Sequence, residues 1–165
     1  MRRLFGRWFK RKRYDYQKNL ALYTDTLLKS QPEAERFSRM IPYLLEKTMG
    51  LICASLAIFK PAAGNYSLHS TKADSNQSTI QADSLLVEEL KKRKTELFLT
   101  EIHKAELEME IRALEAVLVV PGFDKTEKPA ALLNLGSRRS NEQFDRSDIA
   151  YLKKYANKIA SLSAN

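Results

Sequence analysis

The sequence predicts an α+β fold, with a central antiparallel β-sheet of five to six strands flanked by helices and with long N- and C-terminal helices. Three observations predict this class. Segments with helical spacing of apolar residues lie at both ends of the chain. Between them lie short apolar runs bounded by glycine and proline, as in strands. The strand and helix signals follow a mixed order that includes hairpin connections, which favours antiparallel pairing over a parallel sheet.

The composition is that of one globular domain. The chain has 165 residues, of which 44% are apolar and 29% are charged, enough to bury a core without further staples. The single cysteine, Cys53, excludes an intramolecular disulfide and a cysteine-based zinc site, and favours a reducing, cytoplasmic setting. The longest apolar run, residues 49–59, is about half as long as a membrane helix. We therefore expect no membrane-spanning segment and no secretory signal.

The positive charge is concentrated at the N-terminus. Residues 1–13 hold seven of the 28 Lys and Arg and no acid. The rest of the chain therefore has 21 Lys and Arg against 20 Asp and Glu, a net charge of +1 out of the total of +8. Because the domain body is nearly neutral, its charge argues against a nucleic-acid-binding face on the domain. Cations beside large aromatics suit an anionic membrane surface or an adjoining membrane segment, whereas a solvated arm is the plainer interpretation. The predicted membrane-proximal residues are Arg7, Trp8, Phe9, Lys10, Arg11, Lys12 and Arg13.

The next segment, residues 14–32, is expected to be a connector helix. Tyr16, Leu20, Tyr23 and Leu27 recur at spacings of four, three and four, and the helix should end just before Pro32. This heptad-like seam indicates a helix that dimerises with a second copy. An amphipathic helix that packs on its own domain is the alternative. The chain is thereby divided into a tail (1–13), a connector (14–32) and a domain (33–165).

The first half of the domain begins with an amphipathic helix over residues 33–48, which Gly50 ends. The dense apolar run 51–59 predicts a strand buried on both faces. Residues 66–70 alternate between apolar and polar, as in a strand with one wetter face. The small, polar stretch 71–79 is expected to be a loop.

In the second half, Asp83 is expected to cap a helix over residues 84–93. Asp145 is expected to cap the last helix, with Asp148 as its capping-box partner. That helix carries a second heptad-like seam through Ile149, Leu152, Ala156 and Ile159. The intervening elements are a short strand at 96–100, a helix at 101–112, a strand at 116–120 closed by Pro121 and Gly122, a hairpin connection at 123–128 and a strand at 130–135 closed by Gly136.

The C-terminal part resembles a GAF domain. The residues on which this resemblance rests are AALLNLGSRRS at 130–140, Phe144 followed by Asp148, and KIASL at 158–162. In addition, AVLVVP at 116–121 is similar to the GAF strand that precedes this C-terminal signature. The likeness covers roughly residues 33–164 and implies a GAF fold, with the related PAS fold next. It also implies a ligand pocket between the sheet and residues 84–112, for which Tyr66, Phe98 and Asn134 are the candidates. Asn134 is alternatively a buried amide bonded to its neighbours.

Residues 9–17 resemble the cytoplasmic juxtamembrane segment of bacterial membrane-bound sensor histidine kinases, in which a GAF domain precedes a kinase. This chain holds neither a histidine-bearing dimerisation helix nor a glycine-rich ATP lid. The resemblance therefore implies a sensory module that is part of, or derived from, such a two-component sensor, at the inner face of the membrane.

No catalytic constellation is found. His103 lies near Glu101 and Glu106 but is better interpreted as a surface histidine, and Cys53 as a buried thiol. GAF-fold methionine sulfoxide reductases use several cysteines, which one cysteine cannot supply. The cyclic-nucleotide signature of GAF domains is broken, because its glutamate is Ile149 here. Phe144 and Asp148 are therefore interpreted as a packing residue and a helix-start carboxylate.

We accordingly expect a non-catalytic sensory module without a cofactor. It relays a signal through its terminal helices in a homodimer to a downstream kinase or other output domain, and an unknown small molecule biases it. The alternatives are a stand-alone peripheral-membrane or interaction module anchored by the basic tail, and an enzyme on a GAF-like fold.

Overall fold

A computed structural model describes residues 2–30, 33–72 and 76–163, with side chains from Tyr16 onward. One long helix, α1, spans both the predicted tail and the predicted connector. The elements in chain order are α1 (Arg2–Ser30), α2 (Ala34–Met49), β1 (Ala54–Lys60), β2 (Asn65–Ser70), β3 (Thr79–Gln81), α3 (Leu85–Arg93), β4 (Leu97–Phe98), a 3-10 turn (Leu99–Glu101), α4 (Ala105–Ala113), β5 (Leu118–Phe123), β6 (Pro129–Leu135) and α5 (Arg146–Ser163).

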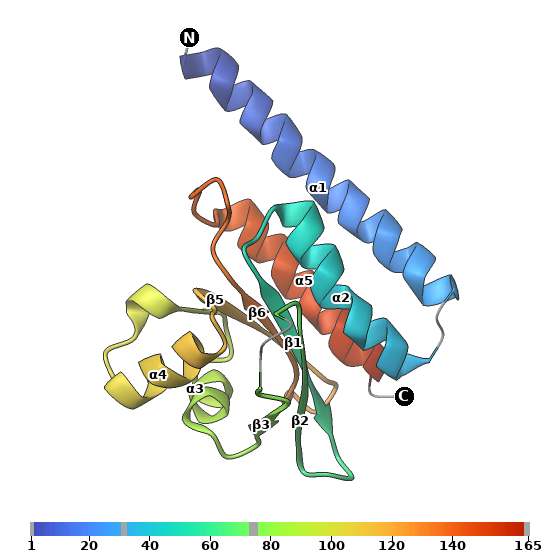
Figure 1. Cartoon of the computed structure of the whole chain (residues 1–165), viewed down its shortest axis with the longest axis vertical. Coiled ribbons are helices and arrows are strands. Elements are labelled where there is room, and N and C mark those ends of the chain that lie inside the picture. Colours follow the sequence, from blue (N-terminus) through green and yellow to red (C-terminus); the bar gives the residue numbers. More distant parts are fainter. Residues whose placement is uncertain (1, 31–32, 73–75, 164–165) are drawn as a thin grey trace.

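The centre of the molecule is a six-stranded antiparallel sheet in the order β3-β2-β1-β6-β5-β4. Helices α2 and α5 cover one face, and α3 and α4 cover the other (Figure 1). Helix α1 lies outside α2 and α5, as a further layer on that side (Figure 1). The predicted α+β class and the flanking terminal helices are confirmed.

The central strand β1 serves two apolar cores, as the dense run 51–59 predicted. Because successive side chains of a strand point to opposite faces, Leu56 and Ile58 pack on the α2/α5 side, whereas Ala57 packs on the α3/α4 side. All three are buried. Because residues paired across neighbouring strands point to the same face of the sheet, each residue of β2 and β6 that pairs with β1 faces the same core as its partner.

One strand in the middle of the chain is missing from the prediction, and one helix cap is misplaced. The edge strand β3 begins at Thr79, the last residue of the predicted loop 71–79, and its one buried side chain, Ile80, gives little sequence signal. Ser84 rather than Asp83 caps α3, since the Ser84 hydroxyl accepts a hydrogen bond from the Val87 backbone N–H at 3.2 Å. The cap therefore lies one residue later than the sequence indicates.

Strand β5 also runs further than predicted, through Pro121 and Gly122 to Phe123. Strand β4 pairs only with Leu118 and Val119, so β5 is an edge strand at Pro121 and the missing N–H costs no ladder bond there. At Gly122 a Cβ would lie 2.1 Å from the carbonyl oxygen of Ala156 in α5. The glycine is there because strand and helix pack closely, not because the strand ends.

The predicted capping box at the start of α5 is confirmed. The Asp145 side chain accepts from the Asp148 backbone N–H, and the Asp148 side chain accepts from the Asp145 backbone N–H, both at 2.8 Å. The seam of α5 faces the sheet, where Leu152, Ala156 and Ile159 are buried. This carboxylate pair positions Asp148 for the contacts described below.

Candidate functional site

The structure separates the three residues predicted to line a pocket. Tyr66 and Asn134 lie on the α3/α4 side of the sheet. Asn134 pairs with Val119, which belongs to the α3/α4 core. Phe98 pairs with Leu118 and packs against the opposite core. Phe98 therefore belongs to the α2/α5 side and does not share a site with the other two.

Tyr66 holds the outer part of the sheet together. Its side chain is 2% exposed, and its hydroxyl donates to the Pro129 carbonyl at 2.5 Å. Its ring packs on Phe59 with centroids 5.2 Å apart. Burial, together with the nearby carboxylate of Asp124, raises the pKa of Tyr66 to about 12. This phenol is a structural donor in the described conformation.

Asn134 is one of two buried polar residues on the paired strands β1 and β6, with Ser55. It is 1% exposed, and its Nδ2 donates to the Ser55 hydroxyl directly across the β1–β6 ladder at 3.1 Å. Its Oδ1 has no hydrogen-bond partner among the described residues. An unpaired buried carbonyl of this kind costs about 1–3 kcal/mol. The side-chain amide of Asn134 therefore bonds to the neighbouring strand β1 through Nδ2, while Oδ1 is a buried acceptor without a partner among the described residues on the α3/α4 side of the sheet.

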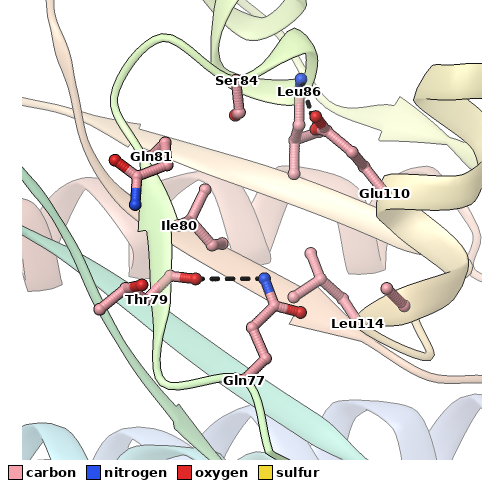
Figure 2. Close-up of a pocket in the computed structure, with 9 residues that line it drawn as sticks. Gln77, Thr79, Ile80, Gln81, Ser84, Leu86, Glu110 and Leu114 are labelled. Atoms are coloured by element: carbon pink, nitrogen blue, oxygen red, sulfur yellow. Dashed lines mark hydrogen bonds between the residues drawn. The ribbon is translucent and has the colours of Figure 1, made fainter.

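Side chains fill the space between the sheet and α3/α4, including Leu86, Leu90, Leu107, Ile111 and Leu132, all buried. A pocket of about 220 Å³ lies at the edge of this side, next to β3. Figure 2 shows the β3 residues on one side of it, and Glu110 of α4 and Leu114, which directly follows α4, on the other. Neither Tyr66 nor Asn134 lines this pocket.

Glu110 is the charged residue of this pocket, and its carboxylate is already engaged. It accepts from the Leu86 backbone N–H at 2.9 Å and from that of Leu85 at 3.2 Å (Figure 2 shows the first). These are orphan N–H groups of the first turn of α3, and the helix dipole favours a negative charge there. Glu110 thereby ties α4 to the start of α3.

A second candidate site joins the first helix to the last. We call Tyr16, Arg138 and Asp148 the α1–α5 junction; all three are buried. Asp148 Oδ1 accepts from the Tyr16 hydroxyl at 2.5 Å and from Arg138 Nη2 at 3.0 Å. The Arg138 guanidinium also lies over the rings of Phe144, at 5.1 Å, and Tyr16, at 5.8 Å. Burial and then the bond to Asp148 raise the pKa of Tyr16.

Further along the same interface, α1 and α5 run side by side in the same direction. The hydroxyls of Thr24 and Tyr155 lie 2.8 Å apart and are buried. Lys158 Nζ donates to Asp25 at 2.9 Å near the surface. Burial raises the pKa of Tyr155, so its hydroxyl stays protonated as a hydrogen-bonding group. Polar contacts thus accompany the apolar packing of α1 along the helix pair.

The predicted dimer residues of α1 fall on two faces. Tyr16 and Leu20 are buried in the α2/α5 core and Leu27 packs against it. These three residues therefore fit the alternative interpretation, in which the helix packs on its own domain. Tyr23 is 48% exposed, and its neighbour Leu22 is 61% exposed. The side chains of the predicted membrane-proximal residues 7–13 lie outside the described residues.

Sequence reasoning missed the α1–α5 junction, although it singled out both Tyr16 and Asp148. Asp148 was expected at the start of a helix and Phe144 in packing, and both placements are confirmed. The residue that sequence reasoning missed is Arg138, which is buried although the basic pair Arg138 and Arg139 is typical of solvated sequence. A buried arginine needs a carboxylate partner, but the sequence offers many candidates.

Burial shifts the pKa values of Cys53 and His69. The Cys53 thiol is buried and donates to the Glu115 carbonyl at 3.4 Å, and burial raises its pKa, which disfavours the reactive thiolate. Burial lowers the pKa of His69. In the part of the chain that the structure describes, no cluster of three His, Cys, Asp or Glu side chains could hold a metal ion.

Comparison with known proteins supports the fold and leaves the family unassigned. No family model and no curated protein matches the chain. Among solved structures, it is similar to the GAF domain of a phosphoenolpyruvate-protein phosphotransferase from Coxiella burnetii, with 14% identity, a TM-score of 0.65 and 89% of each chain covered.

Two further structures share this architecture. One is the phycoerythrobilin-bound GAF domain of a cyanobacterial phytochrome, with 12% identity, a TM-score of 0.64, and 90% of this chain and 96% of that chain covered. The other is free methionine-R-sulfoxide reductase from Neisseria meningitidis in complex with its substrate, with 14% identity, a TM-score of 0.62 and 90% of each chain covered. The chain has a GAF fold, and this fold carries both binding modules and enzymes.

Proposed function

We propose that this chain is a non-catalytic sensory or regulatory GAF module that relays a signal from its first helix to its last. Similar folds occur as the GAF domain of a phosphotransferase and as the pigment-bound GAF domain of a phytochrome. The reductase with this fold is an enzyme, but Cys53 is a single buried thiol here. A sensor-kinase origin, and a downstream kinase or other output domain, belong to this proposal.

The observation that carries it is the α1–α5 junction. The carboxylate of Asp148 bonds to Tyr16 of α1 and, through its other oxygen, to the backbone N–H of Asp145 that precedes α5. A shift of α1 that removes Tyr16 therefore changes the environment of the group that caps α5. Helix shifts of about 1–2 Å at packed interfaces are a common way of passing a signal.

The test is hydrogen exchange in the full chain and in Tyr16→Phe, which loses the hydroxyl and keeps the ring. Exchange in the first two turns of α5, over residues 146–152, is expected to speed up in this variant. Tyr43→Phe makes the same change at an exposed position of α2 and should leave α5 unchanged. Unaltered protection of α5 in Tyr16→Phe would show that the two helices are not coupled through this contact.

A homodimer is part of the proposal, but its contact surface is the outer face of α1 and α2. Tyr16 and Leu20 are occupied inside the domain, whereas Leu22, Tyr23, Met40 and Tyr43 are large exposed side chains on these two helices. Light scattering should find a dimer for the full chain and a monomer for Leu22→Glu/Tyr23→Glu. Lys29→Glu is the surface control on α1. A monomeric full chain contradicts this part of the proposal.

A small molecule that biases the module would bind on the α3/α4 side. The support is the pocket of about 220 Å³ beside β3, whose lining combines Ile80 and Leu114 with the amides of Gln77 and Gln81. Leu114→Trp would fill this pocket, so it should abolish ligand-induced thermal stabilisation in a small-molecule screen. A hit that stabilises this variant as strongly as the unmodified chain binds elsewhere.

A further inference from the structure

The N-terminal half of α1 extends beyond the domain. Tyr16 contacts Asp148 in the first turn of α5, and the later contacts of Thr24 with Tyr155 and Asp25 with Lys158 show that α1 runs parallel to α5. Residues before Tyr16 therefore continue past the start of α5. Figure 1 shows no other helix or strand beside this part of α1. At 1.5 Å per residue, residues 2–15 add about 20 Å of helix.

The helical spacing of this half sorts its residues into two faces. At about 100° per residue, Leu4, Phe5, Trp8 and Phe9 fall within an arc of about 140°. Around the rest of the helix fall Arg2, Arg3, Arg7, Lys10, Arg11 and Arg13. Lys12 falls inside the apolar arc, where its long stem would allow the charge to reach the polar boundary. An apolar arc rich in aromatics opposite a face of cations is the pattern of a helix that lies in a membrane interface.

The charge distribution selects the kind of membrane. Residues 1–13 carry seven cations and no acid, and the rest of the chain is close to neutral. Attraction to an anionic surface would therefore be a property of this half-helix and not of the domain. In the parts of the chain that the structure describes, no helix has the length and apolar character needed to cross a bilayer. A helix that lies on the membrane surface brings its apolar arc to the acyl chains and its cations to the headgroups at the same time.

We propose that residues 2–13 of α1 form an interfacial anchor that binds anionic phospholipid, with the apolar arc inserted among the acyl chains and the cations at the headgroups. This inference does not depend on the relay or on the homodimer. Four large apolar residues in one arc favour lipid over nucleic acid, since phosphate contacts alone need only the cations. Because α1 is continuous into the α1–α5 junction, the anchor also fixes how the domain stands on the surface.

The test is co-sedimentation of the full chain with vesicles of phosphatidylglycerol and phosphatidylcholine, and with vesicles of phosphatidylcholine alone. The full chain should bind the anionic vesicles and not the neutral ones. Trp8→Ala/Phe9→Ala keeps the net charge and should weaken binding by about tenfold or more, because inserted apolar surface is lost. Arg7→Glu/Lys10→Glu should weaken it by at least about tenfold, since each cation contributes about fivefold near such a surface.

The matched control is Lys91→Glu/Lys92→Glu on α3, which makes the same change in net charge at exposed positions of the domain. It should bind the anionic vesicles like the unmodified chain. Equal losses in this control and in Arg7→Glu/Lys10→Glu would overturn the anchor in favour of nonspecific charge attraction. So would full vesicle binding by Trp8→Ala/Phe9→Ala, or a tighter hold on a single-stranded oligonucleotide than on the anionic vesicles. Thermal melting of every variant checks that the domain stays folded.

Discussion

At the scale of single residues, the Ser55–Asn134 pair is a polar contact on the α3/α4 side of the two central strands. Asn134 donates to Ser55, but its carbonyl oxygen finds no partner among the described residues. Folding therefore removes from water one acceptor that it does not satisfy. A pair of this kind is a candidate for function, because apolar residues would hold the same strands together at lower cost.

A single and a double variant test this balance. Ser55→Ala leaves the Asn134 amide without its acceptor and should lower the free energy of unfolding by about 1–3 kcal/mol. Ser55→Ala/Asn134→Val replaces both polar groups and should be as stable as the unmodified chain, or more so. Urea unfolding measures both differences. A double variant that is less stable than Ser55→Ala would mean that Asn134 has a partner that satisfies its carbonyl.

Tyr66 predicts a dependence of stability on alkaline pH. Its pKa is raised from 10.0 to about 12 in the folded chain, so the protonated phenol is favoured by folding. This contribution is fully present below pH 10 and is lost as the pH rises from 10 towards 12. Tyr66→Phe should therefore lose less stability over that interval than the unmodified chain, by up to about 3 kcal/mol. A parallel decline in both chains would contradict the assignment.

Individual side chains were the hardest level to predict from the sequence. The burial of Asn134 follows from its place among leucines, and Cys53 is buried as expected. The separation of Phe98 from Tyr66 does not follow, because the face of a two-residue strand such as β4 depends on its register with β5. That register is set by packing between distant segments.

At the scale of elements, β5 and α5 pack closely against each other at Gly122. Gly122 allows this approach, since any Cβ at that position would overlap the backbone of Ala156. Most element types were predicted correctly from apolar spacing. The errors occur where such spacing is short or absent, as in β3, or where the environment allows a proline within a strand, as in β5.

Gly122→Ala should push α5 away from the sheet and lower the free energy of unfolding by about 2 kcal/mol or more. Gly64→Ala is the comparison, because Gly64 has a φ of +69° with open space around its Cα. That change should cost only about 1 kcal/mol. Thermal unfolding of the two variants gives the order. A Gly122→Ala variant that is the more stable of the two would show that α5 can adjust to the added methyl group.

At the scale of the whole molecule, the first and last helices are joined by buried polar groups. The sequence could not decide whether the seam of α1 packs on its own domain or on a second copy, because either surface satisfies the same apolar spacing. In this structure Tyr16 and Leu20 of α1 are buried in the α2/α5 core, and the buried charge of Arg138 is met by Asp148. Tyr16 then joins the same carboxylate and holds α1 in place.

Asp148→Ala should cost about 3–5 kcal/mol, because it leaves the buried Arg138 guanidinium without a counter-charge. Urea unfolding measures the loss, and hydrogen exchange should show α1 released first. Asp83→Ala removes a carboxylate that does not cap α3 and should change stability by less than about 0.5 kcal/mol. A loss of similar size in both variants would indicate that the α1–α5 junction has no special weight.

The parallel course of α1 and α5 places the Arg2 end of the first helix and the Ser163 end of the last at opposite ends of the molecule (Figure 1). Because α1 is one continuous helix, the direction that its amphipathic half faces is tied to the orientation of the domain. One residue inserted between Arg13 and Tyr16 would turn the amphipathic half by about 100° about the helix axis while leaving the domain intact. Seven inserted residues would nearly restore the original direction and only lengthen α1. Orientation of the domain on a surface would thus follow the angle of insertion rather than its length.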